Sequence, residues 1–268
     1  MRPLNHELRT ESAVVVKLGG AILADPVAVT AVWESIAAHR QRAVVVHGGG
    51  PQTTALARRL GHEPRIVAGR RVTTDLDLDV ALYVLRGELN ARLVASARAH
   101  DVRAVGVSGA DGGLVSVHRR PPREIDGEAI DFGHVGDIDR VDPALLASLL
   151  ASGFVPVVAT VCADDVGALY NVNADTVASE LAAAIGASRL DLVTDAGGVR
   201  RDAEDPASLL SGLTTSDIEA GIAEGWIAGG MRPKMAVAQA ALDRGVRAVR
   251  VCGPSDLADA TAGTTITP

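Results

Sequence analysis

Short apolar runs alternate along the chain with longer segments in which apolar residues recur every three to four positions. The short runs are rich in Val and are typical of buried strands, whereas the longer, Ala- and Leu-rich segments have the period of helices. The pattern predicts strands at 13–17, 43–47, 104–107, 155–160, 190–194 and 248–252. Strands that alternate with helices in this way are typical of an α/β protein with a mostly parallel sheet.

The expected helices cover the segments between these strands, at 26–39, 52–60, 75–85, 89–100, 143–151, 174–185, 216–223 and 231–244. Asp25 is placed to cap the first helix, and Pro26 suits its first turn. Hairpins or irregular excursions are expected in the polar, turn-rich segments 63–72, 113–119, 128–139 and 167–172. No repeat of roughly 20–50 residues is present, which excludes solenoids and propellers.

Composition and charge narrow the classes of function. The chain is 47% hydrophobic, too apolar for a disordered protein, and its net charge of −7 disfavours nucleic acid or an anionic membrane as a partner. No stretch approaches the roughly 18 apolar residues of a membrane span, and the first ten residues lack a signal-peptide core, so we expect a cytoplasmic protein. Cys162 and Cys252 have no potential metal ligands at suitable spacing, and we expect both to be buried small hydrophobes, with no protein-held metal.

The two lysines are the most informative basic residues. Of the 26 Lys and Arg residues, 24 are Arg, and only Lys17 and Lys234 are Lys. A compact ammonium suits a phosphate where a planar guanidinium does not. Lys17 ends a strand and precedes Gly19 and Gly20, and the next strand ends in the sequence HGGG at 47–50. Each loop taken alone is equally consistent with a tight turn, but two loops at neighbouring strand ends predict one shared anion site.

Three further segments carry candidate chemistry. Arg71 precedes a helix and suits a carboxylate, which its guanidinium would bind through two hydrogen bonds. Asn171 and Asn173, half of the four asparagines in the chain, precede the helix that contains Asp175, where capping and function are compatible. Lys234 lies near the start of the helix expected at 231–244, which follows Gly229 and Gly230. The chain has neither a P-loop nor a G-x-G-x-x-G motif, so the known nucleotide fingerprints are absent.

An ordered set of motifs gives these segments a family context. The sequence contains KLGG (17–20), HGGG (47–50), GRRVT (69–73), VGVSGADG (105–112), HVGDI (134–138), YNVNAD (170–175), TDAGGV (194–199) and GGMRPK (229–234). In order and spacing this set resembles the amino acid kinase family, and within it the branch that phosphorylates N-acetyl-L-glutamate. The resemblance runs from about residue 13 to residue 267.

The resemblance implies a three-layer αβα sandwich around a central, mainly parallel β-sheet, the carbamate kinase-like fold. It implies an N-terminal lobe, residues 1–187, that binds N-acetyl-L-glutamate and dimerises, and a C-terminal lobe, residues 188–268, that binds ATP. The implied reaction is the ATP-dependent phosphorylation of the substrate's γ-carboxylate to N-acetyl-L-glutamyl 5-phosphate, the second step of arginine biosynthesis, with Mg²⁺ bound to the ATP. Two alternatives stay open: a kinase for an N-blocked 2-aminoadipate in lysine biosynthesis, and a catalytically silent arginine or nitrogen sensor.

The resemblance also implies roles for individual residues. Lys17 is expected at the transferring phosphoryl group and Lys234 near the leaving ADP, with Asp175 orienting both ammonium groups. The implied substrate-binding residues are Gly49, Gly50, Arg71, Asn171 and Asn173. The implied nucleotide-binding residues are Gly19, Gly20, Thr194, Asp195, Gly197, Gly198, Val199, Trp226, Ile227, Ala228, Gly230 and Met231.

The chain departs from the family pattern in a few places. Ala91 and Ala110 stand where relatives frequently have Lys, and we expect those positions to be peripheral. About a dozen residues precede the first strand, and residues 253–264 lack the His- and Glu-bearing signature of arginine-inhibited relatives. These differences imply a homodimer that arginine does not inhibit.

Overall fold

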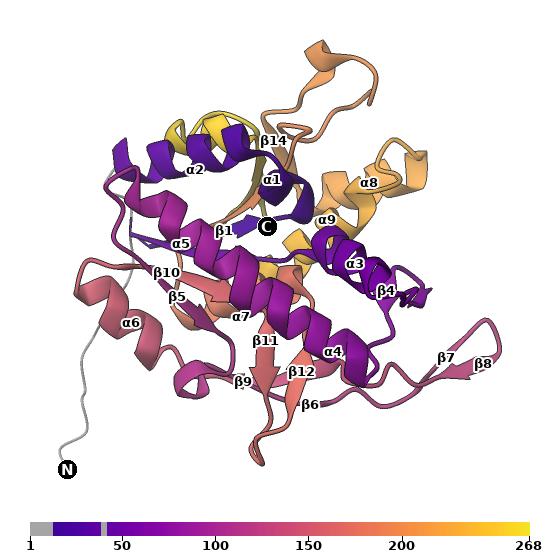
Figure 1. Ribbon diagram of the computed structural model, residues 1–268. Helices are drawn as coiled ribbons and strands as arrows, with labels where there is room; N and C mark the ends of the chain where they lie inside the picture. Colours follow the sequence, from indigo (N-terminus) through magenta and orange to yellow (C-terminus); the bar gives the residue numbers. More distant parts are fainter. Residues whose placement is uncertain (1–12, 39–41) are drawn as a thin grey trace.

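The computed structural model describes residues 13–38 and 42–268, and its centre is an eight-stranded sheet (Figure 1). The strand order is β14-β16-β15-β13-β1-β2-β10-β5, and all neighbouring pairs are parallel except β15 and β16. The strands are β1 Val14–Leu18, β2 Ala43–His47, β5 Ala104–Ser108, β10 Val155–Ala159, β13 Arg189–Val193, β14 Gly212–Thr214, β15 Val249–Cys252 and β16 Thr264–Thr267. All six predicted strands are therefore confirmed, with ends that shift by at most one residue.

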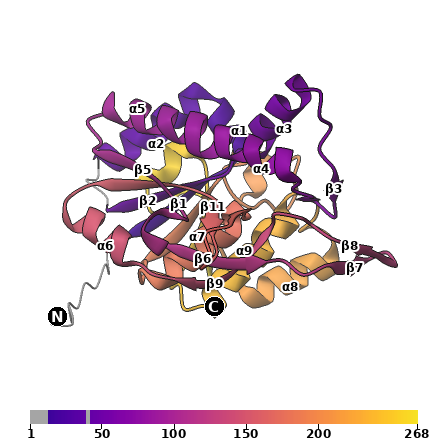
Figure 2. The same ribbon diagram turned by 60° about the horizontal axis from the view of Figure 1, so that its bottom comes forward.

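Helices cover both faces of this sheet, with α2 and α5 on one side and α7, α8 and α9 on the other (Figure 2). The first group contains α1 Gly20–Ala24, α2 Pro26–Ala38, α3 Gly50–Arg59, α4 Asp75–Ala81, the π-helix η1 Leu82–Leu89 and α5 Asn90–Arg98. The second contains α6 Ala144–Ala151, α7 Ala174–Ala184, α8 Thr215–Glu224 and α9 Met231–Asp243. The expected three-layer αβα sandwich is confirmed. His39, the expected end of the first long helix, and residues 1–12 lie outside the described residues.

Smaller elements fill the segments that were expected to be irregular. A second, four-stranded sheet has the order β12-β11-β6-β9, and two short hairpins pair β3 with β4 and β7 with β8. The bounds are β3 Ile66–Val67, β4 Arg70–Arg71, β6 Val115–Arg119, β7 Arg123–Ile125, β8 Glu128–Ile130, β9 Gly136–Val141, β11 Val161–Ala163 and β12 Leu169–Asn171. Short 3₁₀ turns occur at η2 Asp111–Gly113, η3 Pro206–Ser208 and η4 Pro254–Ala258.

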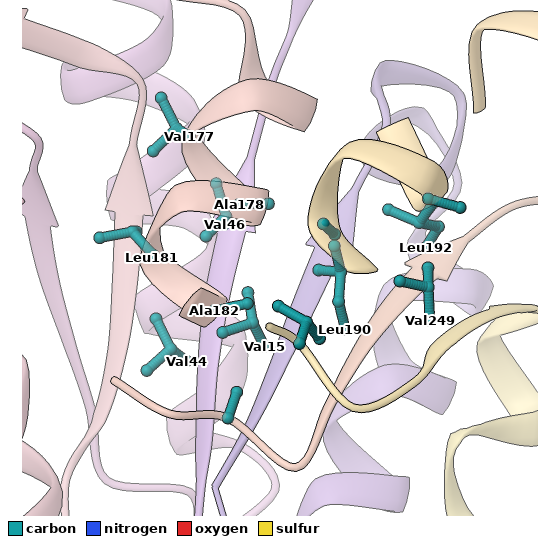
Figure 3. Close-up of a cluster of buried hydrophobic side chains, with 14 of the residues drawn as sticks. Val15, Val44, Val46, Val177, Ala178, Leu181, Ala182, Leu190, Leu192 and Val249 are labelled. Carbon is teal, nitrogen blue, oxygen red and sulfur yellow. The ribbon is translucent and has the colours of Figure 1, made fainter. Parts of the chain in front are cut away.

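The central strands are apolar on both faces, which explains their uninterrupted runs of Val. Val15 packs with the cluster that includes Leu181 of α7, whereas Val14 and Val16 pack with the cluster that includes Trp33 of α2. Figure 3 shows Val15 and its neighbours in β2 facing the apolar side of α7. Successive side chains of a strand point to opposite faces, so a strand covered by helices on both sides needs no polar positions.

One fully buried ion pair joins the C-terminal strands. Arg250 of β15 and Asp191 of β13 are both inaccessible to solvent, and Nε of Arg250 donates to Oδ1 of Asp191 at 3.0 Å. Arg250 also donates to the carbonyl of Leu257 in η4, which packs on α2. Burial alone would lower the pKa of Arg250, but the Asp191 carboxylate outweighs burial and raises it. Since a buried charge needs a partner, this pair stabilises the packing of η4 on the sheet.

A buried histidine, His47, lies at the end of β2 where the glycine loop 48–50 begins. His47 lies next to its backbone neighbour Gly48, with Nδ1 at 2.9 Å from the Gly48 carbonyl, and its Nε2 is 3.1 Å from Nδ2 of Asn90. The Asn90 amide also donates to the carbonyl of Val157 at 2.9 Å, which links α5, β2 and β10. Burial lowers the pKa of His47 to about 4, so the ring is neutral and accepts from Asn90. His47 thus connects the glycine loop after β2 to α5.

Both cysteines are buried and unpaired, as expected, and burial raises the pKa of each thiol to about 12. Over residues 13–38 and 42–268, we find no helix with the length and apolarity that a membrane crossing requires.

Replacing Asp191 tests the buried ion pair. Asp191→Asn leaves the Arg250 guanidinium buried without its counter-charge, and we expect the free energy of unfolding to fall by about 3–5 kcal/mol. Urea unfolding followed by circular dichroism measures this loss. The matched control is Asp165→Asn, which removes an exposed partner of Arg140 and should leave stability almost unchanged. Equal losses in the two variants would contradict the assignment.

The pH dependence of stability tests the neutral state of His47. In the unfolded chain His47 binds a proton below pH 6.5, whereas the folded protein accepts it only near pH 4. The free energy of unfolding should therefore decrease by about 3 kcal/mol as the pH falls from 6.5 to 4, and this term should stay constant at lower pH. Urea unfolding of wild type and His47→Gln across this range isolates the contribution, because other groups titrate in both proteins. Identical slopes would show that His47 titrates normally.

Candidate active site

The carboxyl ends of β1 and β2 lie side by side because the two strands pair in parallel, with Leu18 opposite His47. β1 continues through Gly19 into α1, and β2 continues through Gly48 and Gly49 into α3. The backbone N–H of Gly48 donates to the Leu18 carbonyl at 3.1 Å and joins the two turns. The free N–H groups at the start of α3 therefore lie beside the end of β1, an arrangement that favours an anion.

Two glycines of these loops are required by close packing. A Cβ atom at Gly49 would overlap Leu89 Cδ1 and lie 2.7 Å from Leu85 Cδ2, both in η1. A Cβ atom at Gly20 would lie 2.5 Å from Cδ of Pro51. A Cβ atom at Gly20 would thus collide with the rigid Pro51 ring, whereas a Cβ atom at Gly49 would require the ends of both leucine side chains to move.

Lys17 and Asp175 form the central ion pair of the site, with Nζ and Oδ1 2.7 Å apart. Lys17 lies at the end of β1, and Asp175 lies in the first turn of α7. Asn173 caps α7, since its Oδ1 accepts from the backbone N–H of Asp175 at 2.9 Å and of Thr176 at 3.1 Å. The cap fixes the start of the helix and thereby holds the Asp175 carboxylate against Lys17. The Lys17 and Asp175 side chains are 15% and 28% exposed, so the pair faces a solvent-accessible space.

That space is a pocket of about 250 Å³ that collects most of the predicted phosphate- and substrate-binding residues. Its wall includes Lys17, Gly19, Gly20, Gly49, Gly50, Arg71, Asn171, Asn173 and Asp175. Segments as distant in sequence as residue 17 and residue 175 therefore meet in one cavity, as the motif order implies.

Arg71 and Asn171 present hydrogen-bond donors to this pocket. Arg71 lies in β4, its side chain is 11% exposed, and its Nη2 donates to Oγ1 of Thr54 at 2.6 Å. Asn171 ends β12, and its Nδ2 lies 3.4 Å from Oγ1 of Thr73. A guanidinium and a side-chain amide on one small cavity suit a ligand with carboxylate and amide oxygens.

Sequence reasoning missed the apolar part of the pocket wall and two threonines, namely Thr53, Ala81, Leu85, Thr160 and Val172. Ala81 and Leu85 are one helical turn apart and belong to the segment that follows Arg71, which is the signal that could have found them. Both side chains are almost completely buried, so burial alone does not distinguish them from core residues.

Lys234 does not share the Asp175 carboxylate with Lys17. Its Nζ donates to the Gly230 carbonyl of its own helix at 3.3 Å, and within residues 13–38 and 42–268 Asp175 forms an ion pair with Lys17 alone. A second pocket of about 350 Å³ is lined by residues of α7 and α9, with Asp175 and Pro233 both in its wall. In the described residues the structure thus brings Asp175 together with Lys17 and not with Lys234.

The predicted nucleotide segment begins beside the same strand ends. β13 pairs in parallel with β1, with Val193 opposite Leu18, so Thr194 and Asp195 leave the sheet next to Gly19. Oγ1 of Thr194 donates to Oδ1 of Asp195 at 3.1 Å, and the Asp195 side chain is exposed. The turn after β13 is therefore open to solvent on the side of the glycine loops.

Burial divides the remaining nucleotide candidates into two groups. Val199 and Ile227 are 1% and 2% exposed, and their side chains pack in the main core, so only their backbone is available to a ligand. Trp226 is partly covered by the guanidinium of Arg201, whose Cζ lies 4.8 Å from the ring centre. The positions with exposed or partly exposed atoms are Asp195, Gly197, Trp226, Ala228, Gly230 and Met231, whereas Thr194 and Gly198 are buried.

The sequence of the chain is similar to a known family and to individual proteins within it. The sequence model of the amino acid kinase family matches residues 12–253. An acetylglutamate kinase of Symbiobacterium thermophilum is 43% identical over 242 residues, which cover 89% of this chain and 83% of the relative. An acetylglutamate kinase of Methanopyrus kandleri is 44% identical over 233 residues, which cover 87% of this chain and 92% of the relative.

The fold is similar to that of a solved Giardia carbamate kinase, with a TM-score of 0.67 at 15% identity over 96% of this chain and 99% of the other. This likeness confirms the carbamate kinase-like fold that was expected from the motifs. The family model matches residues 12–253, and two relatives that align with most of the chain are 43% and 44% identical to it. The chain therefore belongs to the amino acid kinase family.

Proposed function

We propose that the chain is a cytoplasmic acetylglutamate kinase. It transfers the γ-phosphoryl group of ATP to the γ-carboxylate of N-acetyl-L-glutamate and forms N-acetyl-L-glutamyl 5-phosphate and ADP in arginine biosynthesis. The observation that carries this proposal is the pocket of about 250 Å³ in which Lys17, Arg71 and Asn171 meet the two glycine loops. The relatives named acetylglutamate kinase support the same reaction.

The chemistry requires positioning more than proton transfer. A γ-carboxylate with a solution pKa of about 4.3 is ionised at neutral pH and attacks phosphorus without a general base. The main obstacle is the repulsion between this carboxylate and the triphosphate. The Lys17 ammonium, held by Asp175, and the free N–H groups of the glycine loops supply positive charge where the two anions meet. They lower the barrier because they are already in place before the reaction.

The rest of the pocket matches the other groups of the substrate. The Arg71 guanidinium binds the α-carboxylate through two hydrogen bonds, and the Asn171 amide binds the acetamido group. The apolar wall at Ala81 and Leu85 accommodates the acetyl methyl group. Asn173 acts mainly by capping α7, since its side-chain oxygen is already used there.

The nucleotide is assigned to the C-terminal part of the chain. Residues 1–187 form the lobe for the acyl substrate and residues 188–268 the lobe for ATP, with the boundary between α7 and β13. Lys234, at the start of α9, stabilises charge on the leaving ADP. A Mg²⁺ ion that enters with ATP would be held mainly by phosphate oxygens and water. Bound in this way, Mg²⁺ supplies further neutralisation of phosphate charge.

An acyl phosphate trap tests the proposal directly. In the presence of ATP, Mg²⁺ and hydroxylamine, the product reacts to a hydroxamate that is measured by colour. We expect N-acetyl-L-glutamate to be preferred over N-acetyl-L-2-aminoadipate, L-aspartate and L-glutamate at equal concentration. Turnover of the aminoadipate derivative alone would overturn the substrate assignment. ATP binding without any hydroxamate would favour a sensor instead of an enzyme.

Exchanging each lysine for arginine tests whether the site needs an ammonium. We expect Lys17→Arg and Lys234→Arg each to lower kcat at least about tenfold, although the charge is retained, because a planar guanidinium cannot take the place of a point charge on phosphate. The matched control is Arg140→Lys, the reverse exchange in an exposed ion pair, which should leave kcat unchanged. Near-normal turnover in both lysine variants would contradict the assigned roles.

The sheet edge at β5 supports the homodimer. β5 is the last strand of the central sheet, and beside it lies a groove of about 820 Å³ whose wall includes Ala91, Val94 and Ala95 of α5. An edge strand has unpaired backbone groups that proteins normally cover. A twofold contact that joins β5 to β5 of a second copy would cover this edge on both subunits.

Mass measurement in solution tests this contact. Light scattering after gel filtration should give the mass of a dimer for the wild type. Ala95→Glu places a charge in the groove and should produce monomers, whereas Ala223→Glu, an equally exposed helical alanine on α8, should remain dimeric. A monomeric wild type, or dissociation of both variants, would exclude the β5 interface.

A further inference from the structure

A buried carboxylate lies directly behind Arg71. Asp77, in the first turn of α4, has a side chain that is only 1% exposed. Its Oδ2 accepts from the backbone N–H of Thr74 at 3.2 Å and from the Thr74 hydroxyl at 2.7 Å. The same oxygen is 3.0 Å from Nε2 of His62. One carboxylate oxygen is thus fully used by the helix cap and by His62.

The other carboxylate oxygen of Asp77 faces Arg71 instead. Oδ1 is buried, makes no hydrogen bond within the described residues, and lies 3.5 Å from Nη1 of Arg71. Nη1 is likewise buried and without a hydrogen bond in this part of the chain. Buried ionic groups normally have partners, and here the two unsatisfied atoms face each other.

The Arg71 guanidinium is therefore held on two sides. On one side Nη2 donates to Oγ1 of Thr54 and lies 3.4 Å from the Gly50 carbonyl of the glycine loop. On the other side the Asp77 carboxylate faces Nη1. Two fixed contacts on a planar group set its orientation, which is the property that recognition of a carboxylate through two hydrogen bonds requires.

The charge of Asp77 is maintained in spite of its burial. Burial alone would raise the pKa of this carboxyl group, but the hydrogen bonds from Thr74 and His62 outweigh it and lower the pKa below the usual range. At neutral pH the group is thus an anion and compensates the charge of Arg71.

We propose that Asp77 is a positioning residue for substrate binding, which orients the Arg71 guanidinium toward the α-carboxylate of the acyl substrate. The inference rests on the proposed function, in which Arg71 binds that carboxylate. Asp77 itself does not line the pocket and acts only through Arg71. Loss of the Asp77 charge should weaken substrate binding equally in the ground state and in the transition state, so KM rises while kcat stays constant.

The alternative is that Asp77 only caps α4, and the chain contains a matched control for it. Thr214 and Asp217 form the same capping box at α8, in which Oδ2 of Asp217 accepts from the N–H and the hydroxyl of Thr214, both at 2.7 Å. Asp217 is exposed and faces no arginine in the described structure. Asp77→Asn and Asp217→Asn therefore make the same change to the same motif at two places.

The experiment compares steady-state kinetics and unfolding of the two variants with those of the wild type. We expect Asp77→Asn to raise KM for N-acetyl-L-glutamate about tenfold or more, with kcat and KM for ATP within about twofold. Asp217→Asn should leave all three values unchanged. Unchanged kinetics in Asp77→Asn, or equal changes in both variants, would reduce Asp77 to a cap and overturn the proposal.

Two further measurements keep the result decisive. Thr54→Val removes the other contact of the guanidinium and should also raise KM for the acyl substrate. This variant tests the proposal even if Asp77→Asn does not fold.

Calorimetric titration with N-acetyl-L-glutamate measures the effect of Asp77→Asn on substrate affinity in the wild type and in an Arg71→Ala background. In the Arg71→Ala background the effect of Asp77→Asn on affinity should vanish. Additive effects would show that Asp77 does not act through Arg71. Failure of the wild type to phosphorylate N-acetyl-L-glutamate would instead remove the proposed function, and the inference with it.

Discussion

The contact between Lys17 and Asp175 depends on the position of β1 in the middle of the sheet. β1 pairs in parallel with both β2 and β13, and α7 packs against one of its faces. Three strand ends and the start of one helix consequently meet at a single point. Because both faces of β1 are buried, the backbone of Lys17 cannot move without disturbing the core. The ammonium group therefore occupies a fixed place relative to both glycine loops, and the remaining site residues are arranged around it.

The central strands could be predicted from the sequence because their environment leaves a simple pattern. A strand covered on both faces consists mostly of Val, Leu, Ile and Ala, as β1 and β2 show directly, whereas β13 also contains Arg189 and the buried Asp191. The helix that follows Arg71 could not be predicted correctly. The pattern predicts two separate helices at 75–85 and 89–100, whereas the chain continues from α4 through η1 into α5 without interruption. The wider π-helical turns place Leu85 and Leu89 over Gly49, a tertiary contact that local sequence does not encode.

The site residues that could be predicted stand out in the sequence itself, whereas those that could not be predicted owe their place to tertiary packing. Lys17 is conspicuous because the chain otherwise uses Arg, and Asn171 because asparagine is scarce. Asp77 resembles any acidic residue in the first turn of a helix, and its place behind Arg71 arises only when α4 packs near β4. Ile227 is the opposite case, since the family resemblance implies that it contacts the nucleotide, whereas its side chain lies in the core. Motifs thus locate a segment, whereas burial decides which atoms of the segment reach a ligand.

The packing at Gly49 also restricts how the sequence of this chain can change. Any side chain at position 49 meets Leu85 and Leu89 at less than van der Waals distance. A side chain at position 49 therefore needs the ends of both leucine side chains to move aside. A smaller residue at position 85 or 89 would make room for it, but that change alone would open a cavity beside the pocket. Which residues the glycine loop accepts thus depends on the residues of the π-helix.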